Sequence, residues 1–199
     1  MSTPASAAAD GSLHSQGHGG HNLTGMVIFL ISESLIFFAF FAGYVVFKQS
    51  SPLWLPEGVE GLEVRGPLLF TVILVSSSFV AYFAERALAA RRLWLFRALW
   101  ALTMIMGSVF LVGQALEWAA LPFGLQSGVF GSSFFLLTGF HGLHVLTGIA
   151  LMALMLVRSF RSGNYDGGEA GVISVSLFWH FVDVIWIILF VLIYVWQRN

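Results

Sequence analysis

Cysteine is absent from the 199 residues. The chain therefore holds no disulfide, thiolate metal site, iron–sulfur cluster or cysteine nucleophile. Charged residues are also scarce, at 10% of the chain, whereas a soluble domain carries roughly 25%. Such a chain has too few charges to cover a water-facing surface. Its net charge of −1 also argues against nucleic acid as a partner, because binding a phosphate backbone requires clustered lysine and arginine.

Apolar residues are abundant instead, at 58% of the chain, and the mean hydropathy is +0.86. Long apolar runs cover about 26–47, 67–84, 94–116, 128–157 and 172–196. A helix needs about 20 residues to cross the hydrocarbon core of a bilayer, and none of the runs alternates as barrel strands do. The sequence therefore predicts an all-α integral membrane protein, with a five-helix transmembrane domain over 26–199.

The first 25 residues are rich in serine, alanine, glycine and histidine and hold no long apolar run. We expect residues 1–25 to form a disordered polar tail. His14, His18 and His21 could bind a metal loosely, but the composition favours a solvated low-complexity segment.

Basic residues are distributed unevenly between the two sides of the membrane. One side receives the arginines of the second and fourth loops, namely Arg86, Arg91, Arg92, Arg97, Arg158 and Arg161. The other side receives only Lys48, Arg65 and Arg198. Because lysine and arginine concentrate on the cytoplasmic face, the sequence predicts a cytoplasmic N-terminus.

Six ionisable residues fall within the predicted helices, where they are costly and must face the bundle interior. They are Glu33, Glu117, His141, His144, His180 and Asp183. The two histidines of the fourth run are three residues apart, as are His180 and Asp183, so each pair shares a helical face. The simplest interpretation is a buried polar seam in which imidazoles donate hydrogen bonds to carboxylates on neighbouring helices. From the residues alone, a metal or haem site and a proton path remain as alternatives.

Three shorter patterns within the predicted helices also indicate how side chains are used. Glu33 stands between two serines, where it is either a carboxyl that exchanges protons or a neutral packing residue. The serines 76–78 are expected to bond back to their own helix. The pair Ala39 and Gly43 fits a close contact between helices.

Four segments in order resemble the haem–copper oxidase subunit III family. The two most specific are Gly139-Phe-His-Gly-Leu-His-Val145 with Thr147-Gly148, and Phe178-Trp-His-Phe-Val-Asp-Val-Ile-Trp186. Phe29-Leu-Ile-Ser-Glu-Ser34 resembles the family's first-helix motif with its buried carboxylate, and Gly113-Gln-Ala-Leu-Glu-Trp118 resembles its Gln-x-x-Glu segment. The chain looks like the short five-helix bacterial form, which lacks the first two helices of the seven-helix members.

The resemblance implies a subunit without a catalytic role of its own, in a proton-translocating cytochrome c oxidase of aerobic respiratory electron transport. Partner subunits I and II would hold the haem and copper at which oxygen is reduced to water, and this chain would hold neither a cofactor nor a metal. It would stabilise subunit I and support proton uptake, with Glu33 as the candidate for uptake and Glu117, His141, His144, His180 and Asp183 as the structural seam. Membrane lipid is an expected partner, and a bound phospholipid stays an open expectation.

Two alternatives remain for the function. The chain could serve a quinol oxidase of the cytochrome o type, although the segment Pro52-Leu-Trp-Leu-Pro-Glu-Gly58 and Glu33 look more like the cytochrome c type. It could also be a stand-alone proton or solute transporter. The expected location is the bacterial plasma membrane, or the thylakoid membrane in a cyanobacterium.

Overall fold

A computed structural model describes residues 10–52, 54–56, 58–59, 61–161, 165 and 169–196, with only the backbone for residues 10–22. The elements are α1 (Asp10–Ser50), α2 (Arg65–Ala89), α3 (Leu93–Ala120), α4 (Gly128–Ser159), α5 (Ala170–Phe190) and the π-helix η1 (Val191–Val195). Five helices in this part of the chain are long and apolar enough to cross a membrane. No strand occurs among the described residues, so the predicted all-α five-helix bundle is confirmed.

Helix α1 begins earlier than the sequence suggests. Its apolar span starts at Leu23, but the helix itself starts at Asp10, within the segment expected to be a disordered tail. Once a helix has nucleated, each added residue contributes one more backbone hydrogen bond, so helical structure continues into the polar segment. Residues 1–9 and the side chains of His14, His18 and His21 lie outside the described residues.

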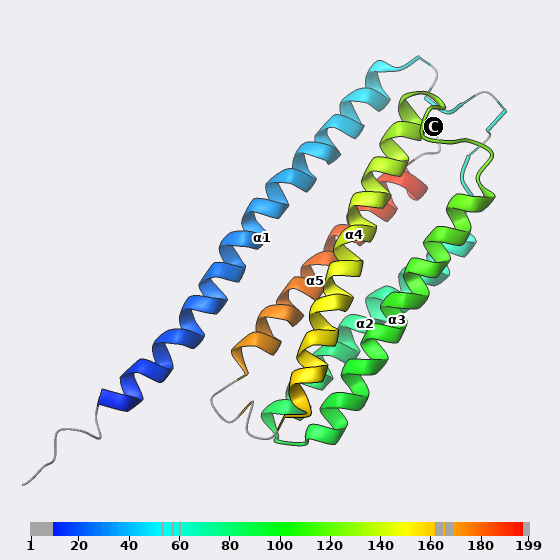
Figure 1. Cartoon of the computed structure of the whole chain (residues 1–199). Helices are drawn as coiled ribbons and strands as arrows, with labels where there is room; N and C mark the ends of the chain where they lie inside the picture. The colour runs from blue at the N-terminus through cyan, green and yellow to red at the C-terminus, as the bar shows by residue number, and fades with distance from the viewer. Residues whose placement is uncertain are drawn as a thin grey trace, which may run out of the picture.

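The other helices also extend past their apolar runs. Helix α2 continues through Glu85 and Arg86 to Ala89, because backbone hydrogen bonding does not stop where hydropathy falls. A tight turn at Arg91, with φ of 59°, reverses the chain into α3. The Arg91 guanidinium donates to the carbonyl of Tyr165 at 3.1 Å, which joins this turn to the connection between α4 and α5. Both arginine-rich connections lie at the end of the bundle opposite the C-terminus (Figure 1).

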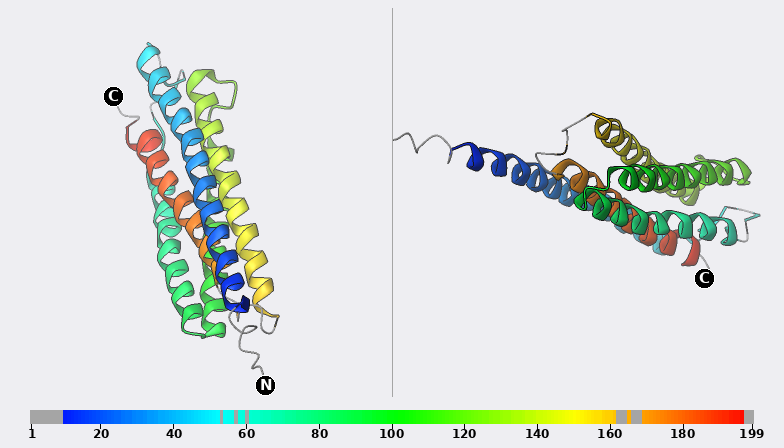
Figure 2. Two further views of the ribbon diagram at one scale, coloured as in Figure 1. Left: turned by 90° about the vertical axis from the view of Figure 1, so that its left-hand side faces the viewer. Right: turned by 90° about the horizontal axis from the view of Figure 1, so that it is seen from below.

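Helix α5 occupies the centre of the bundle. It packs against α1, α2 and α4. Of the residues in its most apolar stretch, 56% are buried, compared with 17% in the corresponding stretch of α1. Figure 2 shows α5 between α1 and α2, with α1 along one flank of the molecule. This central position explains why α5 carries the densest cluster of buried aromatic residues.

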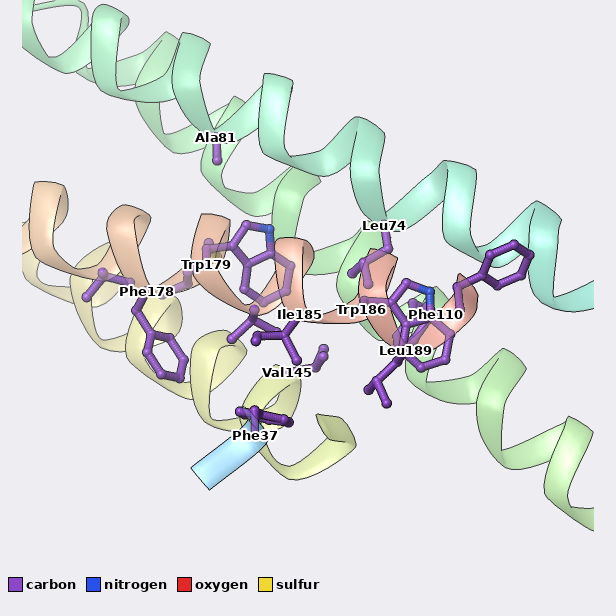
Figure 3. Packing of buried hydrophobic residues seen from close by; sticks show 14 of the residues in the cluster. Phe37, Leu74, Ala81, Phe110, Val145, Phe178, Trp179, Ile185, Trp186 and Leu189 are labelled. Carbon is purple, nitrogen blue, oxygen red and sulfur yellow. The ribbon is translucent and has the colours of Figure 1, made fainter. Parts of the chain in front are cut away.

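Trp179 of α5 is fully buried in the core (Figure 3). A Cβ atom placed on Gly107 of α3 would lie 2.5 Å from its indole, and one on Gly148 of α4 would lie 2.7 Å away. Only glycine therefore lets α3 and α4 approach this ring. The indole nitrogen donates to Ser77 Oγ of α2 at 2.9 Å, so one side chain brings four helices together.

The pair of small residues on α1 does not make the helix contact that its spacing suggested. Ala39 is exposed, and a Cβ on Gly43 would meet nothing within 4 Å. The two residues instead line a shallow pocket of about 100 Å³ between α1 and α4. Nearer the end of α1, Lys48 donates to the backbone carbonyl of Trp196 and lies over its indole ring. This contact holds α1 against the end of the α5–η1 segment.

Candidate functional site in the membrane interior

Glu33 of α1 and His144 of α4 meet across the bundle. His144 Nε2 lies 3.2 Å from Glu33 Oε2, and its Nδ1 lies 2.8 Å from the carbonyl oxygen of Phe140. The side chains are 16% and 12% exposed for Glu33 and His144. The edges of Phe37 and Phe140 pack around the imidazole, so aromatic rings surround much of the pair.

The geometry of this pair fixes how many protons it holds. A carbonyl oxygen only accepts hydrogen bonds, so His144 Nδ1 carries a proton that it donates to Phe140. One further proton then lies between His144 Nε2 and Glu33 Oε2, and it belongs either to a neutral carboxyl or to an imidazolium paired with a carboxylate. In both arrangements the pair as a whole is uncharged. A neutral unit of this kind can lie within a bilayer, where an isolated charge is costly.

A second group joins α5 to α2 through Ser78. The Ser78 hydroxyl donates to Asp183 Oδ2 and lies 2.9 Å from His180 Nδ1. Because its single proton is donated to Asp183, Ser78 accepts from His180 Nδ1–H. Ser176 Oγ lies 3.4 Å from His180 Nε2, which can accept its proton. Asp183 is 3% exposed, and its Oδ1 atom has no hydrogen-bond partner in the described part of the chain.

The third group lies near the end of the bundle that holds the C-terminus. Tyr194 of η1 donates to Glu117 Oε1 at 2.8 Å, and Gln114 Nε2 donates to Glu117 Oε2 at 3.3 Å. Both carboxyl oxygens of Glu117 therefore accept a hydrogen bond. One comes from its own helix α3, and the other comes from the segment that follows α5.

His141 stands apart from all three groups. Its ring is fully buried, stacked on Trp186 at 4.8 Å between ring centroids and in edge contact with Phe110. Neither ring nitrogen has a hydrogen-bond partner among the described residues. Although His141 and His144 are one helical turn apart, His144 turns to α1 while His141 turns to α3 and α5. The six ionisable residues thus form three separate groups and one lone ring, rather than one continuous seam.

Several polar partners were not recognised from the sequence. Ser77 does donate to its own helix, at the Leu74 carbonyl, as expected for this serine run, but Ser78 donates to Asp183 instead. Thr71 was also missed, and it accepts from Trp186 Nε1 at 2.9 Å. Two features of the sequence indicate these partners. The hydroxyls of Thr71 and Ser78 lie on the face of α2 that carries its buried residues, and a buried indole or carboxyl requires a hydrogen-bond partner.

The described side chains contain no group of three or more histidine, aspartate and glutamate residues placed to hold one metal ion. His144 and Glu33 form a pair, and the histidine and aspartate of α5 are joined through a serine. The described polar contacts connect helices that are distant in the chain.

Comparison with known proteins is consistent across nearly the whole chain. The family model described as cytochrome c oxidase subunit III matches residues 6–198. A protein of Thermostichus vulcanus named cytochrome c oxidase subunit 3 is 42% identical over 186 residues, covering 93% of this chain and 92% of the relative. Proteins with the same name are 41% identical in Synechocystis, covering 89% of this chain and 78% of the relative, and 39% identical in Corynebacterium diphtheriae, covering 85% of each.

Proposed function

Because the chain belongs to the cytochrome c oxidase subunit III family, we propose that it is a core subunit of a haem–copper terminal oxidase and carries no redox centre itself. In this role it stabilises subunit I and supports proton uptake while that subunit reduces oxygen to water. The haem and copper belong to partner subunits I and II. The names of the relatives favour cytochrome c over quinol as the electron donor of the complex.

The scaffold part of the proposal is supported by how the polar groups connect helices. Glu33 and His144 join α1 to α4, Ser78 and Asp183 join α2 to α5, and Glu117 and Tyr194 join α3 to the segment after α5. The linked residues are 111, 105 and 77 positions apart in the chain. Alternative packing would leave these polar groups unpaired in hydrocarbon, so the bundle is locked in one arrangement that can serve as a docking partner.

The observation that carries the proton-uptake part is the Glu33–His144 pair. His144 Nε2 lies within hydrogen-bond distance of Glu33 Oε2, where a proton can be shared, and both side chains are partly exposed. Releasing or accepting a proton changes the charge of the pair by one, and a charge is less costly at a partly exposed position than in a sealed interior. We assign it the role of a proton store beside the uptake path of subunit I.

The proposal includes an orientation and a location. The two arginine-rich connections lie at one end of the bundle, and the positive-inside rule assigns that end to the cytoplasm. The N-terminus is then cytoplasmic, and the C-terminal end faces outward. The expected membrane is the bacterial plasma membrane, or the thylakoid membrane in a cyanobacterium.

Glu33→Gln tests the proton role within the assembled oxidase. Glutamine keeps the shape of the side chain and can donate to His144 Nε2, so we expect assembly and haem content to be unchanged. We expect slower proton uptake, or fewer turnovers before inactivation, because the amide cannot exchange a proton. Glu85→Gln on α2 is the matched control and should leave both quantities unchanged. Normal uptake and normal lifetime in Glu33→Gln would make Glu33 a packing residue.

A further inference from the structure

A pocket of about 390 Å³ lies where α2 begins and α3 ends. Loop residues 61–63 and 121–123 border it, and Phe70 and Leu116 contribute apolar walls. Its volume is in the range of small-molecule sites. It reaches along α3 from Ala120 back to Gly113, which is about 10 Å at 1.5 Å per residue. The pocket therefore extends from the end of the spans into the outer part of the hydrocarbon region.

The shape of the pocket is set by two glycines. A Cβ on Gly113 would lie 2.6 Å from the Phe70 ring, so that ring packs directly on the α3 backbone and forms the inner wall. A Cβ on Gly66 would meet nothing within 4 Å, so free space begins at this first turn of α2. Leu116 is 64% exposed and borders the pocket on the outer, membrane-facing side of α3.

The charged side chains that line the pocket in the described part of the chain are all acidic. Two carboxyl side chains line it, Glu117 and Glu63, while no lysine or arginine among the described residues does. Glu117 accepts hydrogen bonds from Tyr194 and Gln114, but neither donor carries a positive charge. A ligand with an apolar body and a hydrogen-bond-donating polar end complements this pocket, because charge-assisted hydrogen bonds to carboxylates are about twice as strong as neutral ones.

We propose that this pocket binds one membrane lipid, with the upper part of an acyl chain against Phe70 and Leu116 and a donor headgroup at Glu117 and Glu63. The depth of the pocket matches the boundary between headgroups and hydrocarbon, where a lipid presents both parts together. The two carboxyl groups of the pocket select a lipid whose headgroup carries N–H or O–H donors. A primary ammonium and a sugar hydroxyl both qualify, whereas a trimethylammonium headgroup offers no such donor.

The test uses the chain purified with its partner subunits and a phosphatidylethanolamine that carries a photoactivatable group on its acyl chain. After illumination, mass spectrometry locates the label. We expect labelling within 59–70 or 113–123, reduced by excess unlabelled phosphatidylethanolamine about tenfold more effectively than by phosphatidylcholine. If monogalactosyl diacylglycerol also competes, uncharged hydrogen-bond donors are sufficient for binding in the pocket. Competition by phosphatidylethanolamine alone shows that the ammonium charge is also required.

Two sets of variants separate the pocket from non-specific labelling. Gly66→Leu fills the open space and should lower labelling there about tenfold, equivalent to about 1.4 kcal/mol of binding free energy, whereas Gly25→Leu at the opposite end of the molecule should not. Glu63→Gln combined with Glu117→Gln should reduce the preference over phosphatidylcholine to about threefold, since charge assistance roughly doubles hydrogen-bond strength. Glu85→Gln should retain it.

The unaltered chain and the Gly66→Leu variant decide the outcome. Haem content and elution volume of each complex confirm that the variants are assembled. Equal competition by phosphatidylethanolamine and phosphatidylcholine in the unaltered chain would overturn the proposed selectivity. Unchanged labelling in assembled Gly66→Leu would overturn the site. Because assembly is measured separately by haem content and elution volume, either result would leave the proposed oxidase role standing.

Discussion

Replacing Ser78 by alanine would test the central polar link of the bundle. The hydroxyl of Ser78 donates to Asp183 Oδ2 and accepts from His180 Nδ1–H, so its removal leaves two groups without these bonds. Asp183 is affected most, because its other oxygen has no partner among the residues that the structure describes and the side chain is 3% exposed. After the substitution, no described hydrogen bond to this carboxyl remains.

The size of the effect follows from two hydrogen bonds at membrane depth. Stranding a buried polar group in a soluble protein costs about 1–3 kcal/mol, but measured hydrogen bonds between transmembrane helices average about 0.6 kcal/mol and reach about 1.7. The lower scale applies here, because the unfolded chain in a membrane also finds partners. For the two bonds of Ser78 we therefore expect a loss of about 1–3 kcal/mol in the free energy of unfolding.

Unfolding of the purified chain by sodium dodecyl sulfate in mixed micelles, followed by tryptophan fluorescence, measures this loss. Ser108→Ala is the matched control, because Ser108 is exposed and its one hydrogen bond among the described residues goes to the Met104 carbonyl of its own helix at 2.8 Å; its effect should stay within about 0.5 kcal/mol. In a double-mutant cycle, Ser78→Ala and Asp183→Ala should be coupled by at least about 0.5 kcal/mol. Additive effects, or equal effects of Ser78→Ala and Ser108→Ala, would refute the reasoning.

Three further predictions concern packing and the ends of the bundle. Gly148→Ala should lower the free energy of unfolding by about 1–3 kcal/mol, measured in the same assay, because its Cβ would lie 2.7 Å from the Trp179 indole; the same change at a glycine with open space around it should have little effect. Lys48→Met should free Trp196 from α1, seen as increased hydroxyl-radical labelling of the Trp196 indole by mass spectrometry, since Lys48 both donates to its carbonyl and lies over its ring. Burial raises the pKa of the Tyr165 phenol, so its contribution to stability is present below the unfolded value of about 10 and is lost as pH rises through the higher folded value. Tyr165→Phe should remove this alkaline loss in a titration of unfolding free energy against pH, and an unchanged alkaline slope would contradict the assignment.

The five spans could be predicted because hydropathy and length are local properties. Each apolar run must be a helix, since backbone groups in hydrocarbon have to be satisfied within the segment. The helix ends were less accessible to prediction. Helix α2 extends beyond Ala84 to Ala89, because helical hydrogen bonding continues where side chains become polar, and a hydropathy run cannot register this.

The identity of the ionisable residues could also be predicted, but their partners could not. Pairing across helices depends on how each helix is rotated and how far it slides along its neighbours, and neither quantity is local. Ser77 and Ser78 are adjacent in the sequence, yet one hydroxyl bonds to its own helix and the other to Asp183. Likewise His141 stacks on an indole while His144 reaches a carboxylate, because the 60° or so that separates three helical steps from a full turn at 3.6 residues per turn is enough to aim them at different neighbours.

The links between helices distant in the chain also have a consequence for biogenesis. When only the first three helices have been inserted, Glu33, Ser78 and Glu117 all lack the partners that α4, α5 and η1 supply. The fourth helix completes the first link, and the last segment completes the other two together. A nascent chain that stops before its final helix therefore retains uncompensated acidic and hydroxyl groups in the bilayer, which is costly. This gives membrane quality control a chemical difference by which to distinguish an unfinished subunit from a finished one.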